Sequence, residues 1–321
     1  MTKADIFHAQ LVEAVHHHEA GDINKARDLY LAILEKDPEN LRALHLAGLL
    51  CLQCGELDGA EQLLKAARAI DADNPTYINH LGTVALRRGD LDGAAAMFEQ
   101  ALEEDPNYAE ALLNLALVHR GKDDLGIAKA TLDRAIMADN ANDQALMWRG
   151  IVARECGEGA EAIEFLLKAV NINPNNLEAL NQIGESFVDL GELDQAEKCY
   201  RAAMERAPGV ASFRGKLASC LGQMGRFDEA KHMFDEALHR NPDDPALLGG
   251  LALVMAESGA DEAGREIAEK AVSIDPDSID AHYALARIYT RLGDNERSTA
   301  EQNRVRELAP DNARYLAALA G

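Results

Sequence analysis

Proline returns along this chain at a fixed interval of 34 residues. Steps of 34 from Pro38 reach nine places, of which seven hold proline: Pro38, Pro106, Pro174, Pro208, Pro242, Pro276 and Pro310. Proline cannot continue a helix, and it biases the residue before it away from helical angles. The period therefore predicts a row of equal helical units without insertions, rather than a domain built around one core.

Three further columns keep the same interval. Small residues occupy one place in the first half of each unit and another in the second half, where two helices must approach closely. The first column reads Ala14, Gly48, Gly82, Ala116, Gly150, Gly184, Ala218, Ala252 and Ala286, and the second runs from Ala26 to Ser298. Between them lies a column suited to a left-handed turn: Gly21, Gly55, Gly89, Asp123, Gly157, Gly191, Gly225, Gly259 and Gly293. Each unit is thus expected to be a helix, a turn and a second helix.

Residues 177–210 show the unit most clearly, in the stretch LEALNQIGESFVDLGELDQAEKCYRAAMERAPGV. Its packing residues recur every three or four places on either side of a glycine turn, as in two amphipathic helices. The stretch resembles a tetratricopeptide repeat and fills all eight signature places of that family. The resemblance implies an all-α fold, a right-handed superhelical α-solenoid of tandem helix-turn-helix repeats.

We expect a single domain of residues 1–321 with nine repeats and a C-terminal capping helix fragment at 313–321. The repeats are predicted at residues 7–40, 41–74, 75–108, 109–142, 143–176, 177–210, 211–244, 245–278 and 279–312. Gly249 and Gly250 fall inside the first helix of the eighth repeat. They either admit a close backbone or weaken this repeat, by about 1 kcal/mol each relative to alanine.

The net charge and the hydropathy of the chain limit the classes of partner that it is expected to bind. The chain has 55 acidic against 32 basic residues and a formal charge of -23, so its field repels a phosphate backbone and nucleic acid is not expected as a partner. No stretch approaches the roughly 20 apolar residues that span a bilayer, and the first ten residues lack an apolar signal core. We therefore expect a cytoplasmic protein without membrane insertion.

The cysteines and histidines suggest neither disulfides nor a metal site. Five cysteines form an odd set without framework spacing, and the pair Cys51 and Cys54 has no second Cys or His pair at zinc spacing. Successive histidines at 16, 17 and 18 point in different directions on a helix, which favours a solvated or packed helix end. No metal and no cofactor are expected.

The predicted repeats occupy residues 7–312, which leaves no room for a catalytic domain. The sequence also lacks a phosphate-binding loop, a nucleophile elbow and an HExxH motif. We therefore expect the protein not to be an enzyme.

A candidate binding face lies on the first helix of each repeat, opposite its packing residues. In the family that the chain resembles, this face lines the inside of the superhelix and grips peptides. The column His80, Asn114, Trp148, Gln182 and Lys216 and the pair Arg120 and Arg154 stand out along it. The predicted groove residues are Asn79, His80, Arg87, Asn114, Arg120, Met147, Trp148, Arg154, Asn181, Gln182 and Lys216.

Amide, imidazole and indole groups on this face would hydrogen-bond or cover a ligand backbone, and arginines would take carboxylates. The alternative is that Met147 and Trp148 pack on neighbouring helices while the arginines balance a very acidic chain. Asn114 matches a place in the asparagine ladder of O-linked sugar transferases, whereas the Lys, Asn and Arg set of chaperone-tail-binding repeats is absent.

These observations predict a scaffold or adaptor that binds a peptide segment of a protein partner in its concave groove. One alternative is a self-assembling structural protein, hence a possible homo-oligomer. A third interpretation is a targeting module for a separate glycosyltransferase-type enzyme, because residues 26–64 resemble repeats found before bacterial glycosyltransferase or sulfotransferase domains.

Overall fold

The computed structural model describes residues 3–310, so the predicted capping fragment at 313–321 lies outside the described residues. The chain forms two compact units, Met1–Cys156 and Gly157–Gly321, which we call the N-terminal and C-terminal units and treat separately. The helices of the N-terminal unit are α1 (Lys3–Glu19), α2 (Ile23–Lys36), α3 (Leu41–Gln53), α4 (Leu57–Ile70), α5 (Pro75–Arg87), α6 (Leu91–Glu104), α7 (Ala109–Gly121), α8 (Leu125–Ala138) and α9 (Asp143–Glu155). Those of the C-terminal unit are α10 (Gly159–Ile172), α11 (Leu177–Asp189), α12 (Leu193–Arg206), α13 (Ala211–Gln223), α14 (Phe227–Arg240), α15 (Pro245–Glu257), α16 (Asp261–Ile274), α17 (Ile279–Leu292) and α18 (Asn295–Leu308).

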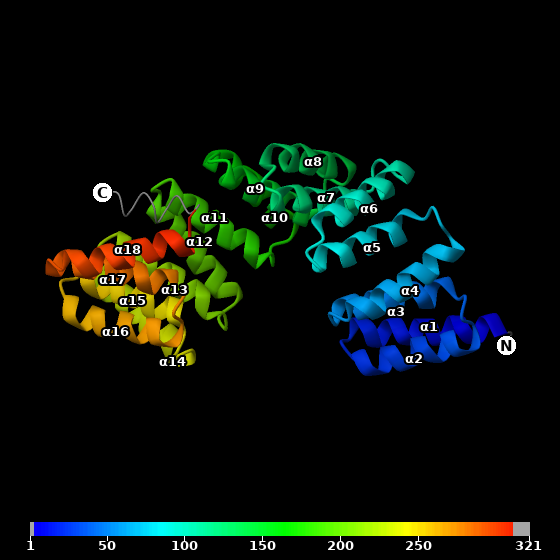
Figure 1. The fold of residues 1–321 in the computed structure, drawn as a ribbon, viewed down its shortest axis with the longest axis horizontal. Coiled ribbons are helices and arrows are strands. Elements are labelled where there is room, and N and C mark those ends of the chain that lie inside the picture. The colour runs from blue at the N-terminus through cyan, green and yellow to red at the C-terminus, as the bar shows by residue number, and fades with distance from the viewer. Residues whose placement is uncertain (1–2, 311–321) are drawn as a thin grey trace. The chain divides into compact units, whose positions relative to one another are not determined.

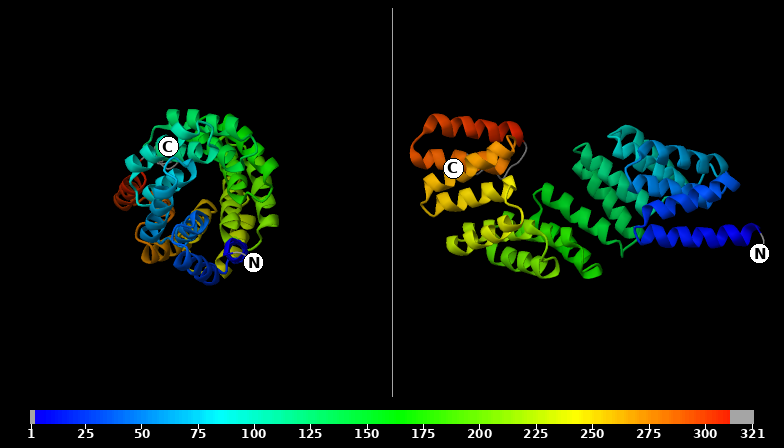
Figure 2. Two further views of the ribbon diagram at one scale, coloured as in Figure 1. Left: turned by 90° about the vertical axis from the view of Figure 1, so that its right-hand side faces the viewer. Right: turned by 90° about the horizontal axis from the view of Figure 1, so that it is seen from below.

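Within each unit the helices lie side by side in pairs that follow one another along the chain (Figure 1). Figure 2 shows the same succession from two further directions. We call the odd-numbered helix of each predicted repeat the leading helix and the even-numbered one the trailing helix. The predicted all-α architecture of tandem helix-turn-helix repeats is confirmed. The boundary between the two units falls inside the fifth predicted repeat, residues 143–176. The organisation of residues 1–321 as a single domain therefore stays a prediction.

Each turn between a leading and a trailing helix contains one residue with a left-handed backbone. Eight glycines of the predicted turn column have φ between 74° and 89°, and the ninth residue, Asp123, has φ 63°. Only glycine adopts this region without a steric cost, and Asp is one of the few other residues that tolerate it. The column that the sequence marked as a left-handed turn is confirmed at all nine places.

The start of each leading helix is fixed by a side-chain cap in most repeats. Asn40, Asn142 and Asn176 each accept a hydrogen bond from a backbone N–H three residues later, at 3.1, 2.9 and 2.9 Å. Such caps satisfy donors that the first helical turn leaves open, and each contributes about 1 kcal/mol. In these three repeats a capping asparagine two residues after the proline place therefore sets where the leading helix begins.

The small column on the leading helices permits close packing within a repeat. A Cβ at Gly82 would lie 2.6 Å from the Phe98 ring, and one at Gly184 would lie 2.5 Å from the Tyr200 ring. The aromatic side chain of the trailing helix thus rests on the backbone of the leading helix. Phe98 is fully buried and Tyr200 is 3% exposed, so this contact is part of the core of these two repeats.

A second set of glycines brings leading helices of different repeats together in the C-terminal unit. A Cβ at Gly215 of α13 would lie 2.5 Å from Leu247 of α15. A Cβ at Gly249 of α15 would lie 2.8 Å from the backbone nitrogen of Ala281 in α17. The sequence left open whether Gly249 admits a close backbone or weakens its repeat. The structure shows the close approach of another backbone at this glycine.

Among the described helices, none is both long enough and apolar enough to cross a membrane.

Candidate functional site

An amide pair joins two leading helices of the N-terminal unit. Asn114 of α7 donates through Nδ2 to Oδ1 of Asn79 on α5, at 3.0 Å. Asn79 is fully buried, whereas Asn114 remains partly exposed. Two residues of the predicted groove are therefore hydrogen-bonded to each other, and the Asn114 amide is accessible for further contacts.

Beside the amide pair, two histidines and a glutamate connect α3, α5 and α7. Nε2 of His45 lies 3.0 Å from Nδ1 of His80, close enough for one ring nitrogen to donate to the other, and the rings are stacked. The other nitrogen of His80 lies 3.6 Å from a carboxylate oxygen of Glu110. Glu110 also accepts a hydrogen bond of 3.1 Å from the hydroxyl of Tyr108. His45 and Glu110 were absent from the predicted site, although both lie on the predicted face.

The environment of this cluster changes its acid–base properties. Burial, together with the neighbouring His80, lowers the pKa of His45 to about 4 and keeps its ring neutral near neutral pH. The neighbouring His80 lowers the pKa of Glu110, which stays ionised. Burial next to Glu110 raises the pKa of Tyr108 to about 12. The carboxylate charge of Glu110 is thus engaged by neighbours inside the N-terminal unit.

Trp148 of α9 lies against α7. The guanidinium carbon of Arg120 is 5.2 Å from the centre of the indole ring, within cation–π range, and Arg120 also makes a bidentate ion pair with Glu155. The indole packs on an apolar cluster that includes Leu132 and Val152 and is only partly exposed. Trp148 therefore has a packing role, and its remaining surface carries the guanidinium of Arg120.

Three other predicted groove residues of the N-terminal unit differ in their exposure. Met147 is 4% exposed and belongs to the interior. Arg87 is exposed and donates to the backbone carbonyl of Leu52 at the end of α3. Arg154 is half-buried near the end of α9.

Predicted groove residues of the C-terminal unit also have local partners. Gln182 donates to Glu178 one turn earlier, at 2.7 Å, and Lys216 makes an ion pair with Glu185. Asn181 and Gln182 are both 9% exposed. The expected column from His80 to Lys216 has members in both units, which are described separately. That its residues form one continuous column therefore stays a prediction.

The sequence did not predict that a charged side chain, that of Arg149, is buried. Arg149 of α9 is 2% exposed, and its Nε lies 2.7 Å from Oδ1 of Asp133 on α8. Stepping by 34 residues shows Leu115 and Ile183 at the same place of neighbouring repeats. That departure from an apolar column is the signal that could have revealed the buried ion pair.

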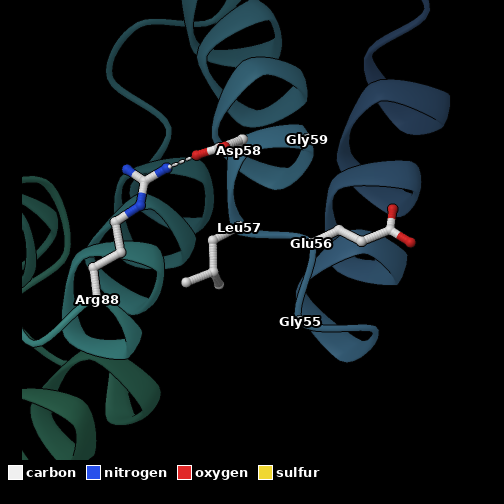
Figure 3. Close-up of a pocket in the computed structure, with 6 residues that line it drawn as sticks. All are labelled: Gly55, Glu56, Leu57, Asp58, Gly59 and Arg88. Carbon is white, nitrogen blue, oxygen red and sulfur yellow. Dashed lines mark hydrogen bonds and ion pairs between the residues drawn. The ribbon is translucent and has the colours of Figure 1, made fainter.

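A shallow pocket of about 480 Å³ opens at the turn between α3 and α4 (Figure 3). It is lined by Gly55, Glu56, Leu57, Asp58, Gly59 and Arg88. Arg88, at the end of α5, makes ion pairs of 2.6 Å with Asp58 and Glu61 of the preceding repeat. These contacts join neighbouring repeats at the turn edge, and exposed pairs of this kind contribute little stability each.

The structure also places the cysteine pair Cys51 and Cys54 and the histidines at 16–18. Cys51 is half-buried and Cys54 exposed, while His18 lies 2.7 Å from Gln53 of the next repeat and 3.3 Å from the hydroxyl of Tyr30. Within residues 3–310, no three His, Cys, Asp or Glu side chains gather in a way that could hold a metal ion.

Solved structures with the same architecture include a tetratricopeptide repeat protein from Parabacteroides merdae, which is 19% identical and aligns with a TM-score of 0.68. That alignment covers 77% of this chain and 98% of the other. A chain of the APC/C hetero-tetramer Cut9-Hcn1 is 16% identical over 83% of this chain and 52% of its own, with a TM-score of 0.64. The pilF protein of Pseudomonas aeruginosa is 18% identical over 78% of this chain and 98% of its own, with a TM-score of 0.50. At these identities the likeness concerns the fold alone. A search of curated proteins found no match.

Models of the tetratricopeptide repeat match most of the sequence. One model matches residues 17–81, 85–150 and 255–321, and others match 143–176, 175–243 and 221–279. Together with the paired helices and left-handed turns, these matches show that the chain belongs to the tetratricopeptide repeat family, whose members are typically non-enzymatic scaffolds for protein interactions.

Proposed function

We propose that the protein is a scaffold that binds a peptide segment of a partner on the leading helices α3, α5, α7 and α9. The observation that carries the proposal is the alignment of polar and aromatic side chains across these helices. Asn79 and Asn114 are linked at 3.0 Å, and Arg120 lies 5.2 Å from the Trp148 ring. Amide and guanidinium groups can bind a peptide backbone and its carboxylates, while an indole covers apolar side chains.

The partly exposed atoms of this surface support an extended ligand. Asn114, Arg120 and Trp148 each retain exposed surface, whereas Asn79 supports Asn114 from below as a buried neighbour. A surface held by hydrogen bonds and packing in the free protein loses little conformational entropy when a ligand binds. The predicted groove residues of this unit thus divide into ligand contacts and the residues that hold them.

Capture of partners from a lysate of the source cells tests the proposal. We expect the double variant Trp148→Ala/Arg120→Glu to lose at least tenfold in affinity for proteins captured by the wild type, since interface aromatic and arginine side chains are frequent hot spots. The matched control is Ile127→Ala/Arg134→Glu, which changes exposed residues of the trailing helix α8. Equal capture by the wild type and the Trp148 variant, with circular dichroism unchanged, would refute the assignment of this face.

Self-association is the competing outcome. Sedimentation velocity over a hundredfold range of concentration separates the two functions, because a self-assembling protein forms larger species as concentration rises. We expect the sedimentation coefficient to stay constant. A concentration-dependent increase that the Trp148→Ala/Arg120→Glu variant abolishes would mean that this face binds a second copy of the chain.

A further inference from the structure

Two neighbouring leading helices of this acidic chain contain no acidic residue. The basic side chains of these two helices are Arg42 and His45 of α3 and His80 and Arg87 of α5. By contrast, α11 of the C-terminal unit has Glu178, Glu185 and Asp189 and no basic residue. The chain as a whole has 55 acidic and 32 basic residues. The leading helix α13 also lacks acidic residues, but its Arg214 and Lys216 form ion pairs with Glu236 and Glu185.

The positive charges on the α3–α5 face are not neutralised by carboxylates. Arg42 is exposed and has no hydrogen bond or ion pair with any residue that the structure describes. Arg87 is exposed and donates to an uncharged group, the carbonyl of Leu52. Three other arginines of this unit pair with carboxylates: Arg27 with Glu56, Arg88 with Asp58 and Glu61, and Arg120 with Glu155.

Glu110 is the acidic group that faces this surface from α7, and its charge is already engaged. It lies 3.6 Å from His80 and accepts a hydrogen bond from Tyr108 at 3.1 Å. The excess negative charge elsewhere acts at longer range. At physiological salt, interactions between exposed charges fade over about 8 Å, so the nearby guanidinium groups decide which ligand charge is favoured here.

We propose that the α3–α5 face binds an acidic stretch of polypeptide, whose carboxylates pair with Arg42 and Arg87. This inference rests on the proposed function and names the chemistry of the ligand. Arg42 is the second residue of α3 and Arg87 the last residue of α5, so they mark opposite ends of the face. A helix of this length spans about 20 Å, which an extended peptide covers with about six residues. The ligand therefore carries acidic groups near both ends of a six-residue segment.

Fluorescence anisotropy with the full chain and three labelled twelve-residue probes tests the proposal. The probes alternate serine with glutamate, lysine or glutamine. We expect the glutamate probe to bind at least tenfold more tightly than the glutamine probe at 50 mM NaCl, and its advantage to shrink at 500 mM NaCl. We expect Arg42→Gln to weaken the glutamate probe about fivefold and to leave the glutamine probe unchanged.

Arg134→Gln is the matched control, because Arg134 is also exposed and unpaired among the described residues but lies on the trailing helix α8. Equal binding of the glutamate and glutamine probes, or equal loss in the Arg42 and Arg134 variants, overturns the proposal. If lysate capture still depends on Trp148 and Arg120 in that case, the peptide-binding function stands and only the acidic ligand is refuted. If the wild type captures no partner and binds none of the probes, the proposed function itself fails.

Discussion

One place in the repeat differs between α3 and α5 of the N-terminal unit and α13 and α15 of the C-terminal unit. In the N-terminal unit it holds His45 and Asn79, whose side chains reach His80 and Asn114 of the following helices. In the C-terminal unit it holds Gly215 and Gly249, where the next leading helix approaches the bare backbone. The same backbone plan thus yields a polar surface in one region and a closed helix contact in the other. Side-chain volume at this place sets how near two leading helices come.

Adding a methyl group at Gly249 should have the largest effect on this comparison. In Gly249→Ala the new Cβ would lie 2.8 Å from backbone atoms of Asp280 and Ala281, which cannot move aside as a flexible side chain can. We expect the free energy of unfolding of the repeats around α15 and α17 to fall by about 3 kcal/mol. Hydrogen exchange of residues 245–292 measures the change.

Gly126→Ala is the control for that substitution, since a Cβ at Gly126 meets no atom within 4 Å. It should leave stability unchanged or raise it by about 0.5 kcal/mol, because alanine favours helix. Equal exchange rates in the wild type and Gly249→Ala would show that α15 and α17 can separate without a loss of stability. The close helix contact at Gly249 would then no longer distinguish the C-terminal unit.

Replacing Asn79 should cost less. Asn79→Leu removes the acceptor of the Asn114 amide, and we expect a loss of about 1.5 kcal/mol in urea unfolding. The double variant Asn79→Leu/Asn114→Leu should recover to within about 0.5 kcal/mol of the wild type, because both polar partners are then gone. If the double variant instead loses the sum of both single effects, the pair is not coupled. A stable double variant that no longer binds peptide would assign the pair to recognition.

The smallest expected effect concerns pH. The pKa of His45 is about 4 in the folded state and about 6.5 in an unfolded chain, so the unfolded state binds more protons between these values. Stability should therefore fall as pH decreases from 6.5 towards 4, by about 1 kcal/mol between pH 6.5 and 5 once partial exposure is considered.

Urea unfolding of the wild type and His45→Gln at several pH values provides the measurement. The variant should show a flatter dependence across pH 6.5–5, because glutamine does not titrate. Glu110, whose pKa is lowered, contributes a loss only below its unfolded pKa of about 4.5. Parallel pH profiles for both proteins would contradict a half-buried His45 whose ring is neutral in the folded state.

The sequence determined the helix pairs and turns of this protein, because those features follow from local sterics. Proline ends a helix, glycine permits the left-handed turn at residues such as Gly191, and a small residue such as Gly82 permits close packing in every repeat. The same residue types recur every 34 residues. The helix pair and turn predicted for one unit, residues 177–210, were therefore predicted for the others as well.

Only the tertiary structure decided which side chains on the leading helices meet. Residues about 35 positions apart, such as His45 with His80 and Asn79 with Asn114, become partners through the spacing of neighbouring helices. The same spacing buries Arg149 beside Asp133 and pairs Arg120 with Glu155, while Arg42 stays unpaired among the described residues. Helical periodicity places a residue on a face, but its exposure and partners depend on the distance to the next helix and on rotamers that no local pattern specifies.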